Sequence, residues 1–246
     1  MWRVPLAVSI AVLVSFPAAI SKTDGGRSGA GSTPTTPPLP ACSISFHVTP
    51  LDGYDDWALT LLDTRLALRS SYVPPDLVST KKAGLNGGHL VRAVAVPDLA
   101  AMARAAGAAG APLAVYSAYR SYKEQSWTFA KWVRVLGPRL AVLGSARSGH
   151  SEHQLGLAID FISKGGPKPW TYYSWARDTK AGRWMAAHAW QYGFVMSYPA
   201  GKTKKTCYGY EPWHYRYVGR DEAAAIHASK LTLREWLWSR QPKRAQ

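Results

Sequence analysis

The densest group of potential metal ligands lies in residues 148–160, which read SGHSEHQLGLAID. Within this segment His153 can offer a neutral imidazole and Asp160 a carboxylate, and both groups are common ligands of zinc. The small residues Gly156 and Ala158 would let the backbone pass close to a metal or a substrate. A catalytic zinc site usually has three protein ligands and one open position, so this pair needs a partner from elsewhere in the chain.

A second polar segment, residues 210–218, could supply that partner. It reads YEPWHYRYV, and His214 would be the third ligand. Glu211 would then accept a proton from the attacking water and pass it to the leaving amine. In a regular strand, positions 211 and 214 point to opposite faces, so both can reach one metal only if the chain turns or bulges near Pro212. The sequence therefore predicts such a turn.

A third segment, residues 116–125, places an arginine between a strand-like run and a helix. It reads YSAYRSYKEQ, in which Ser121 and Glu124 have the spacing of a capping box. Arg120 directly precedes this cap, where its side chain can be aimed into a pocket. Its guanidinium could bind a substrate carboxylate or stabilise an oxyanion, and a surface salt bridge is the alternative role.

The three segments together resemble a known family. The motifs S-x-Y-R-S-x-x-x-Q, S-E-H-Q-x-G-x-A-x-D and E-P-W-H-Y-R-Y-V-G occur in this order within residues 117–219. They are similar to the signature of VanY-type D-alanyl-D-alanine carboxypeptidases, zinc enzymes that share a fold with lysostaphin-type peptidases and the hedgehog signalling domain. The resemblance implies that the zinc ligands are His153, Asp160 and His214.

The same resemblance implies roles for four other residues. Glu211 would be the general base and acid, and Arg120 would contact the substrate carboxylate or the transition state. Gln125 and Ser151 would be substrate contacts. His150 lies in the same segment and is expected to be an extra imidazole near the site rather than a ligand.

The implied reaction is removal of the terminal D-alanine from peptidoglycan stem peptides. The motifs leave open an L,D-carboxypeptidase, a D,D-dipeptidase or an endopeptidase on the same fold, because these differ in the shape of the pocket. A peptidoglycan-binding module without catalysis is a further alternative. Such a module should have lost Glu211 or one of the ligands, and this chain keeps them all.

The composition favours a globular protein with a basic surface. Charged residues make up 18% and apolar residues 47% of the 246 residues, unlike a disordered chain. Lys and Arg number 30 against 15 Asp and Glu, a formal net charge of +15. An anionic cell-wall polymer or membrane surface is a possible partner for this charge. A nucleic-acid partner is not expected, because the sequence has an export signal and lacks a basic helix or an aromatic RNA-binding motif.

That signal is expected in residues 1–20, where one arginine precedes an apolar run and small residues follow it. The run is shorter than the roughly 20 residues that span a bilayer, which favours cleavage over retention as an anchor. Residues 21–41 are rich in Gly, Ser, Thr and Pro and read as a linker. We expect residues 42–246 to form a monomeric domain that is secreted or held at the surface of the bacterial cell envelope.

The two cysteines, Cys42 and Cys207, fit an oxidising exterior. Neither belongs to a C-x-x-C pair, which argues against zinc–thiolate chemistry. We expect them to form a disulfide that ties the start of the domain to the loop at position 207.

Periodicity predicts an α+β domain with a small mixed or antiparallel sheet flanked by helices. Expected helices cover residues 56–68, 97–106 and 178–191. Two more follow the S-x-x-E and T-x-x-E capping boxes at Ser121 and Thr232, the first ending at Gly137-Pro138. Expected strands cover residues 113–118, 157–162, 194–198 and 213–218.

Overall fold

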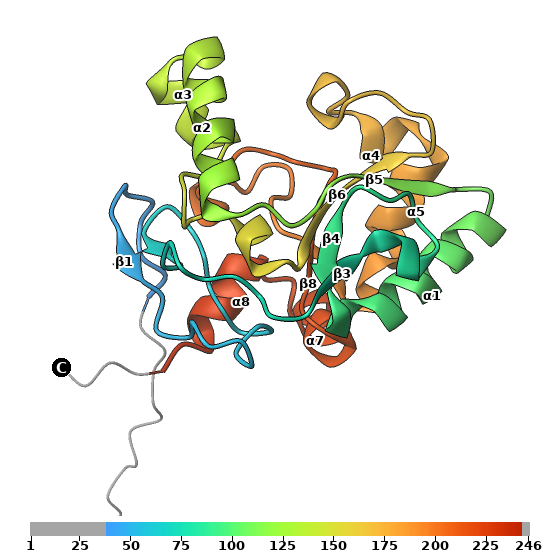
Figure 1. Cartoon of the computed structure of the whole chain (residues 1–246), viewed down its shortest axis with the longest axis horizontal. Coiled ribbons are helices and arrows are strands. Elements are labelled where there is room, and N and C mark those ends of the chain that lie inside the picture. Colours follow the sequence, from blue (N-terminus) through green and yellow to red (C-terminus); the bar gives the residue numbers. More distant parts are fainter. Residues whose placement is uncertain (1–37, 243–246) are drawn as a thin grey trace, which may run out of the picture. The chain divides into compact units, whose positions relative to one another are not determined.

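Four short strands form the sheet that carries the polar segments (Figure 1). They are β5 (Leu113–Ser117), β6 (Ala158–Ser163), β8 (His214–Tyr217) and β7 (Phe194–Met196), in the order β5-β6-β8-β7. Each neighbouring pair is antiparallel. All four strands lie where the sequence predicted them, and the α+β class is confirmed.

The computed structural model describes residues 38–242. The expected signal peptide at residues 1–20 and residues 21–37 of the expected linker lie outside this range. Two smaller ladders accompany the main sheet. β1 (His47–Val48) pairs in parallel with β2 (Leu66–Ala67), and β3 (Leu77–Ser79) pairs antiparallel with β4 (Leu90–Arg92).

Helix α1 (Val96–Ala108) packs on the sheet and closes the main core. Its residues Leu99, Met102 and Ala106 follow the i, i+3, i+7 spacing of one helix face, and all three are fully buried. They share the core with Phe161 of β6. The helix expected from residue 97 is therefore confirmed.

Helix α2 (Tyr122–Leu136) begins at the capping box that the sequence predicted. The hydroxyl of Ser121 accepts a hydrogen bond from the backbone N–H of Glu124, and the Glu124 carboxylate accepts one from the N–H of Ser121. The helix ends before Gly137, which has a φ of 76°, and α3 (Pro138–Gly144) follows directly. Figure 1 shows α2 and α3 standing clear of the sheet.

The remaining helices follow β6. They are α4 (Trp175–Asp178), α5 (Lys180–His188), α6 (Thr203–Thr206), α7 (Arg220–Ser229) and α8 (Leu233–Ser239). The helix expected over residues 178–191 is α5, which starts two residues later because Thr179 caps it and continues as a 3₁₀ turn to Tyr192. The capping box of Thr232 at α8 is confirmed.

The prediction of a helix over residues 56–68 is wrong. The chain makes a turn there and then enters β2. The carbonyls of Trp57 and Thr60 accept hydrogen bonds from the buried guanidinium of Arg216, and the Asp63 carboxylate accepts the backbone N–H groups of residues 65 and 66. These tertiary and local partners satisfy the groups that a helix would otherwise pair.

The disulfide between Cys42 and Cys207 is present, with the two Cα atoms 5.3 Å apart. It joins residues 165 positions apart and thereby links the start of the domain to the residue that ends α6. This confirms the pairing expected from the sequence. Among residues 38–242, no helix has both the length and the apolar character needed to cross a membrane.

Candidate active site

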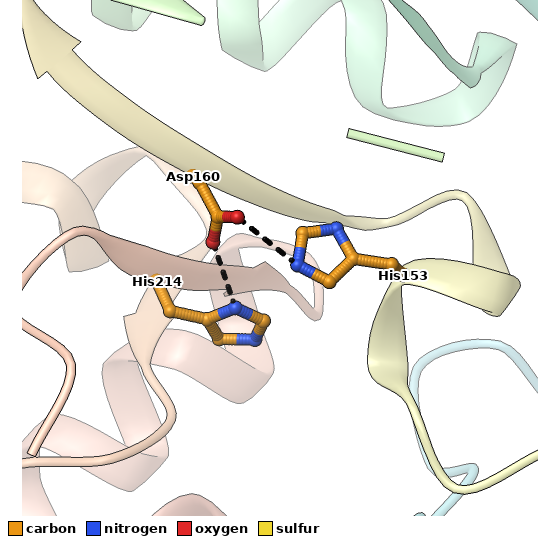
Figure 2. A group of neighbouring side chains, drawn as sticks. All are labelled: His153, Asp160 and His214. Carbon is orange, nitrogen blue, oxygen red and sulfur yellow. Dashed lines mark hydrogen bonds and ion pairs between the residues drawn. The ribbon is translucent and has the colours of Figure 1, made fainter. Parts of the chain in front are cut away.

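Three elements bring the predicted ligands together (Figure 2). Asp160 lies on β6 and His214 begins β8, and the two residues are direct partners in the antiparallel ladder. His153 lies on the 3₁₀ turn Glu152–Leu155, which precedes β6 and ends at Gly156 with a φ of 71°. The left-handed glycine lets the chain reverse between this turn and the strand, so that His153 faces Asp160.

The distances within this cluster suit a metal ion. His153 Nε2 lies 3.4 Å from Asp160 Oδ2, and His214 Nδ1 lies 3.0 Å from Asp160 Oδ1. One ligand atom from each residue lies within 4.8 Å of the others. Zinc bonds of about 2.0–2.2 Å in tetrahedral geometry separate neighbouring ligand atoms by about 3.4 Å, so the spacing fits. All three side chains are buried.

Hydrogen bonds on the far side of each imidazole fix which nitrogen faces the cluster. His153 Nδ1 lies 2.6 Å from the carbonyl oxygen of Ala118, and His214 Nε2 lies 2.9 Å from Glu152 Oε2. A carbonyl or carboxylate oxygen can only accept, so these nitrogens carry the hydrogen. Nε2 of His153 and Nδ1 of His214 are the nitrogens that face the cluster, and a bound metal would replace the hydrogen that His214 Nδ1 otherwise donates to Asp160.

Glu152 is a site residue that sequence reasoning missed. It is 4% exposed and accepts hydrogen bonds from Ser197 Oγ and Arg216 as well as from His214. Burial disfavours its charge, but the hydrogen bond from His214 and the charge of Arg216 outweigh burial and lower its pKa. Its position between Ser151 and His153 in the motif was the available signal.

The electrostatics of the cluster favour a bound cation. Burial lowers the pKa of His153 to about 4, with the nearby charge of Arg120 adding to the effect, so this imidazole is neutral at pH 7. Burial also opposes charge on His214, yet hydrogen bonds and charge from Asp160 and Glu152 raise its pKa to about 10. The two carboxylates therefore stabilise positive charge on His214, which lies between them, and Asp160 would do the same for a metal ion held in the cluster.

Glu211 reaches the cluster through the turn that the sequence required. Residues 211–214 form that turn, in which the N–H of His214 donates to the carbonyl of Glu211. Glu211 Oε2 lies 3.8 Å from His214 Nδ1, beside the ligand atoms but outside the ligand group. Burial raises the pKa of Glu211 to about 7, and the charge of Asp160 adds to this rise. A carboxyl group with this pKa can both accept and release a proton near neutral pH.

Arg120 lies at the edge of the cluster, with Nη1 3.7 Å from Asp160 Oδ2. Its Nε donates to Gln125 Oε1 at 2.9 Å, and Gln125 in turn donates to the carbonyl of Ala146. Gln125 is fully buried. The structure therefore places Gln125 behind Arg120, as a residue that orients the guanidinium, and not on the surface that a substrate would touch.

A cleft of about 340 Å³ opens over these groups. Arg120, Ser151, His153, Glu211 and His214 contribute to its lining. Aromatic side chains form much of the remaining wall, namely Tyr116, Trp132, Trp170, Tyr173, Tyr198, Tyr208 and Trp213. This combination of apolar walls and a few converging polar groups is typical of a site for a small peptide.

His150 lies apart from the cleft lining. Its Nδ1 contacts the carbonyl oxygen of Asp63 at 2.7 Å, and it is not a member of the ligand group. This placement agrees with the expectation that it is an extra imidazole and not a ligand.

Sequence comparison identifies related proteins. YodJ, a protein of Bacillus subtilis (strain 168) that carries the name of a carboxypeptidase, is 37% identical over 182 residues, which are 72% of this chain and 66% of YodJ. A D-alanyl-D-alanine carboxypeptidase of Enterococcus faecalis (strain ATCC 700802 / V583) is 40% identical over 89 residues, which are 36% of this chain and 30% of that protein. The chain thus spans less than two thirds of the length of these relatives.

Solved structures share the fold. The LdcB LD-carboxypeptidase superposes with a TM-score of 0.65 at 33% identity, covering 77% of this chain and 93% of that one. A mutant of the vancomycin resistance D,D-pentapeptidase VanY in complex with Zn(II) superposes with a TM-score of 0.61 at 30% identity, covering 74% and 99%. The family described as VanY, D-alanyl-D-alanine carboxypeptidase, matches residues 88–220, more than half of the chain and all of the site described above. The chain belongs to the VanY family.

Proposed function

We propose that this protein is a zinc-dependent carboxypeptidase that removes the terminal D-alanine from peptidoglycan stem peptides. The observation that carries the proposal is the position of Glu211. A carboxyl group whose pKa is raised to about 7 lies 3.8 Å from the His214 ligand nitrogen, beside a group of three possible ligands and outside it. A binding module without catalysis has no use for such a group.

The residues present fit zinc. Two imidazoles and one carboxylate are a donor set that zinc accepts, and leaving one position open is typical of catalytic sites. His153, Asp160 and His214 would hold the ion. When bound, zinc supplies a Lewis acid that polarises the scissile carbonyl and makes a water more acidic. The VanY structure that superposes on this chain contains Zn(II), which supports the same assignment.

The protein's own groups would divide the remaining work. Glu211 accepts a proton from the attacking water and gives it to the amine of the departing D-alanine. Arg120, held by Gln125, binds negative charge on the substrate, at its terminal carboxylate or at the carbonyl oxygen as the reaction proceeds. The aromatic walls of the cleft hold the peptide and exclude water from these charges.

Two variants test this mechanism by failing in different ways. In Glu211→Gln the side chain keeps its size but cannot act as a base, so zinc should stay bound while kcat falls by about 10²–10⁴-fold. In His214→Ala the site loses one of three ligands, so the zinc content itself should fall. The measurements are metal content by mass spectrometry and D-alanine release from a pentapeptide ending in D-Ala-D-Ala. Near-normal release by Glu211→Gln would contradict the proposed base.

An L,D-carboxypeptidase is the second candidate, and the likeness to LdcB supports it. The two activities differ in substrate: a D,D-enzyme cuts the pentapeptide between two D-alanines, whereas an L,D-enzyme removes D-alanine from the tetrapeptide. Initial rates on both peptides with the same preparation of enzyme decide between them. Activity on the pentapeptide alone supports our proposal, and activity on the tetrapeptide alone supports the alternative.

We also propose that the protein acts outside the cytoplasm, secreted or held at the cell surface of a bacterium, and as a monomer. The apolar run in residues 4–16 supports export, as does a disulfide, which persists in oxidising compartments. Detection of the chain in the envelope or medium fraction, with its N-terminus sequenced, tests the location and the expected cleavage near residue 20.

A further inference from the structure

The hairpin of α2 and α3 carries an unusual amount of exposed apolar surface. Trp127, Val135, Leu136, Leu140 and Leu143 are exposed by 60, 63, 41, 58 and 42%. They are five of the 13 large apolar side chains that are strongly exposed in residues 38–242, gathered in one short segment. Single exposed apolar side chains are normal, whereas a cluster of them often marks an interaction surface.

The hairpin is attached to the domain along little of its length. Within α2, Gln125 is the sole buried residue, and among the described helices and strands α3 is the main packing partner of α2. Figure 1 shows both helices projecting from the sheet.

Basic residues alternate with these apolar residues along the sequence of the hairpin. Residues 122–144 contain Lys123, Lys131, Arg134 and Arg139 against one acid, Glu124, so the hairpin has a net charge of 4 − 1 = +3. The Glu124 carboxylate is engaged in the capping box. Arg134 precedes exposed Val135, and Arg139 precedes exposed Leu140, so each arginine adjoins an apolar side chain in the sequence.

The substrate cleft does not account for these side chains. Thr128, Lys131, Trp132 and Leu136 of the hairpin line the cleft. Trp127, Val135, Leu140 and Leu143 do not belong to its lining. One side of the hairpin therefore forms a wall of the cleft. The remaining exposed apolar side chains lie outside the cleft and form a second surface.

We propose that this second surface binds anionic phospholipid. The hairpin combines Trp, Leu and Val with Lys and Arg, and its one acid, Glu124, is hydrogen-bonded in the capping box. Segments that lie in the membrane interface and insert apolar side chains at the headgroup boundary have this composition. Arg134 and Arg139 would meet lipid phosphates, while Val135, Leu140 and Leu143 would enter the boundary between headgroups and acyl chains. Charge complementarity selects anionic lipid over a neutral partner. The inference does not depend on the proposed enzymatic activity.

Hydrogen–deuterium exchange of the full chain tests the proposal, because it locates the contact. The probes are vesicles of equal parts phosphatidylglycerol and phosphatidylcholine, compared with vesicles of phosphatidylcholine alone. Peptides covering residues 127–143 should exchange at least about threefold more slowly with the anionic vesicles than with the neutral ones. Any membrane affinity of the N-terminal segment is common to all variants, so differences between variants arise from the hairpin.

Two pairs of variants separate the apolar from the basic contribution. The double variant Val135→Asp with Leu140→Asp should lose the protection, because it places charge where the acyl boundary would be. A matched control, Val73→Asp with Leu231→Asp, changes residues of 49 and 39% exposure outside the hairpin and should keep it. Arg134→Gln with Arg139→Gln should weaken the protection on anionic vesicles, whereas Lys82→Gln with Arg104→Gln should not. All eight side chains are exposed, and none lines the cleft.

Three outcomes would overturn the proposal. The first is equal exchange of the hairpin with both kinds of vesicle. The second is unchanged protection in the Val135→Asp, Leu140→Asp variant. The third is slowed exchange of the hairpin without vesicles as protein concentration rises, which would identify a second copy of the chain as its partner.

Discussion

At the scale of single residues, the ligand geometry depends on groups behind the ligands. His153 has a backbone carbonyl as its far-side partner, which no substitution removes, whereas His214 depends on the side chain of Glu152. Glu152 also pairs with Arg216, a fully buried cation. The Glu152 carboxylate thus orients the imidazole of His214 and also pairs with the buried charge of Arg216.

Replacing Glu152 tests this dependence. In Glu152→Gln, the amide oxygen can still accept from His214 but the negative charge is lost, so zinc affinity should fall by about 10-fold or more. Arg216 loses its ionic partner, so the free energy of unfolding should fall by about 3 kcal/mol. Chelator competition and urea unfolding measure the two effects. Ser197→Ala removes one neutral donor to Glu152 and should have a smaller effect on both, and equal zinc affinity in all three proteins would contradict the role of Glu152.

The sequence was sufficient for the candidate ligands and the candidate base, which the structure brings together, and insufficient for the side chains packed behind them. Residue type made His153, Asp160, His214 and Glu211 candidates, and the resemblance of the three motifs to the VanY family assigned their roles. Gln125 was expected at the substrate and lies behind Arg120, since its type allows either position. Which polar side chain is buried behind another depends on packing, and the sequence does not encode that in a local pattern.

At the scale of elements, the N-cap residue of α2, Ser121, directly follows Arg120, so the cap positions a site residue as well as the helix end. Ser121→Ala should cost about 1 kcal/mol of stability, because an N–H of the first turn loses its acceptor. It should also lower kcat/KM at least about threefold, since both Arg120 and Gln125 flank this turn.

The capping box of α8 is the matched control. Thr232→Ala should lose a similar amount of stability with no change in kcat/KM, because Thr232 lies outside the lining of the cleft. The measurements are thermal unfolding and peptide hydrolysis of both variants. Equal effects on activity would show that the cap of α2 has no special connection to the site.

Elements with strong local signals were predictable and those with tertiary partners were not. The two capping boxes and the stripe of α1 act within one turn or one face, and all are present as expected. The apolar residues Trp57, Leu61, Leu62 and Leu66 have helical spacing. The carbonyls of Trp57 and Thr60 nevertheless accept hydrogen bonds from Arg216, about 160 positions away in the sequence. A pattern confined to a short window cannot report such a partner.

At the scale of the whole molecule, the disulfide encloses most of the domain in one covalent loop. Replacing both cysteines by serine should lower the free energy of unfolding by about 2–5 kcal/mol, because the unfolded chain gains the freedom that the 165-residue loop denied it. Guanidinium unfolding with and without a reductant measures this. The reductant should lower the midpoint of the wild type to that of the double variant and leave the variant unchanged. The same unfolding midpoint for the wild type with and without the reductant would contradict the prediction.

Because Asp160 pairs with His214 across β6 and β8, the metal site depends on the register of the sheet. Side chains alternate between the two faces of a strand, so a slip of one residue in this ladder would turn one of the two away from the other. A misaligned sheet therefore could not assemble the ligand set, however well its apolar residues were buried. Zinc binding then reports on strand alignment, and in a preparation saturated with zinc the chains that remain metal-free include those whose sheet closed in the wrong register.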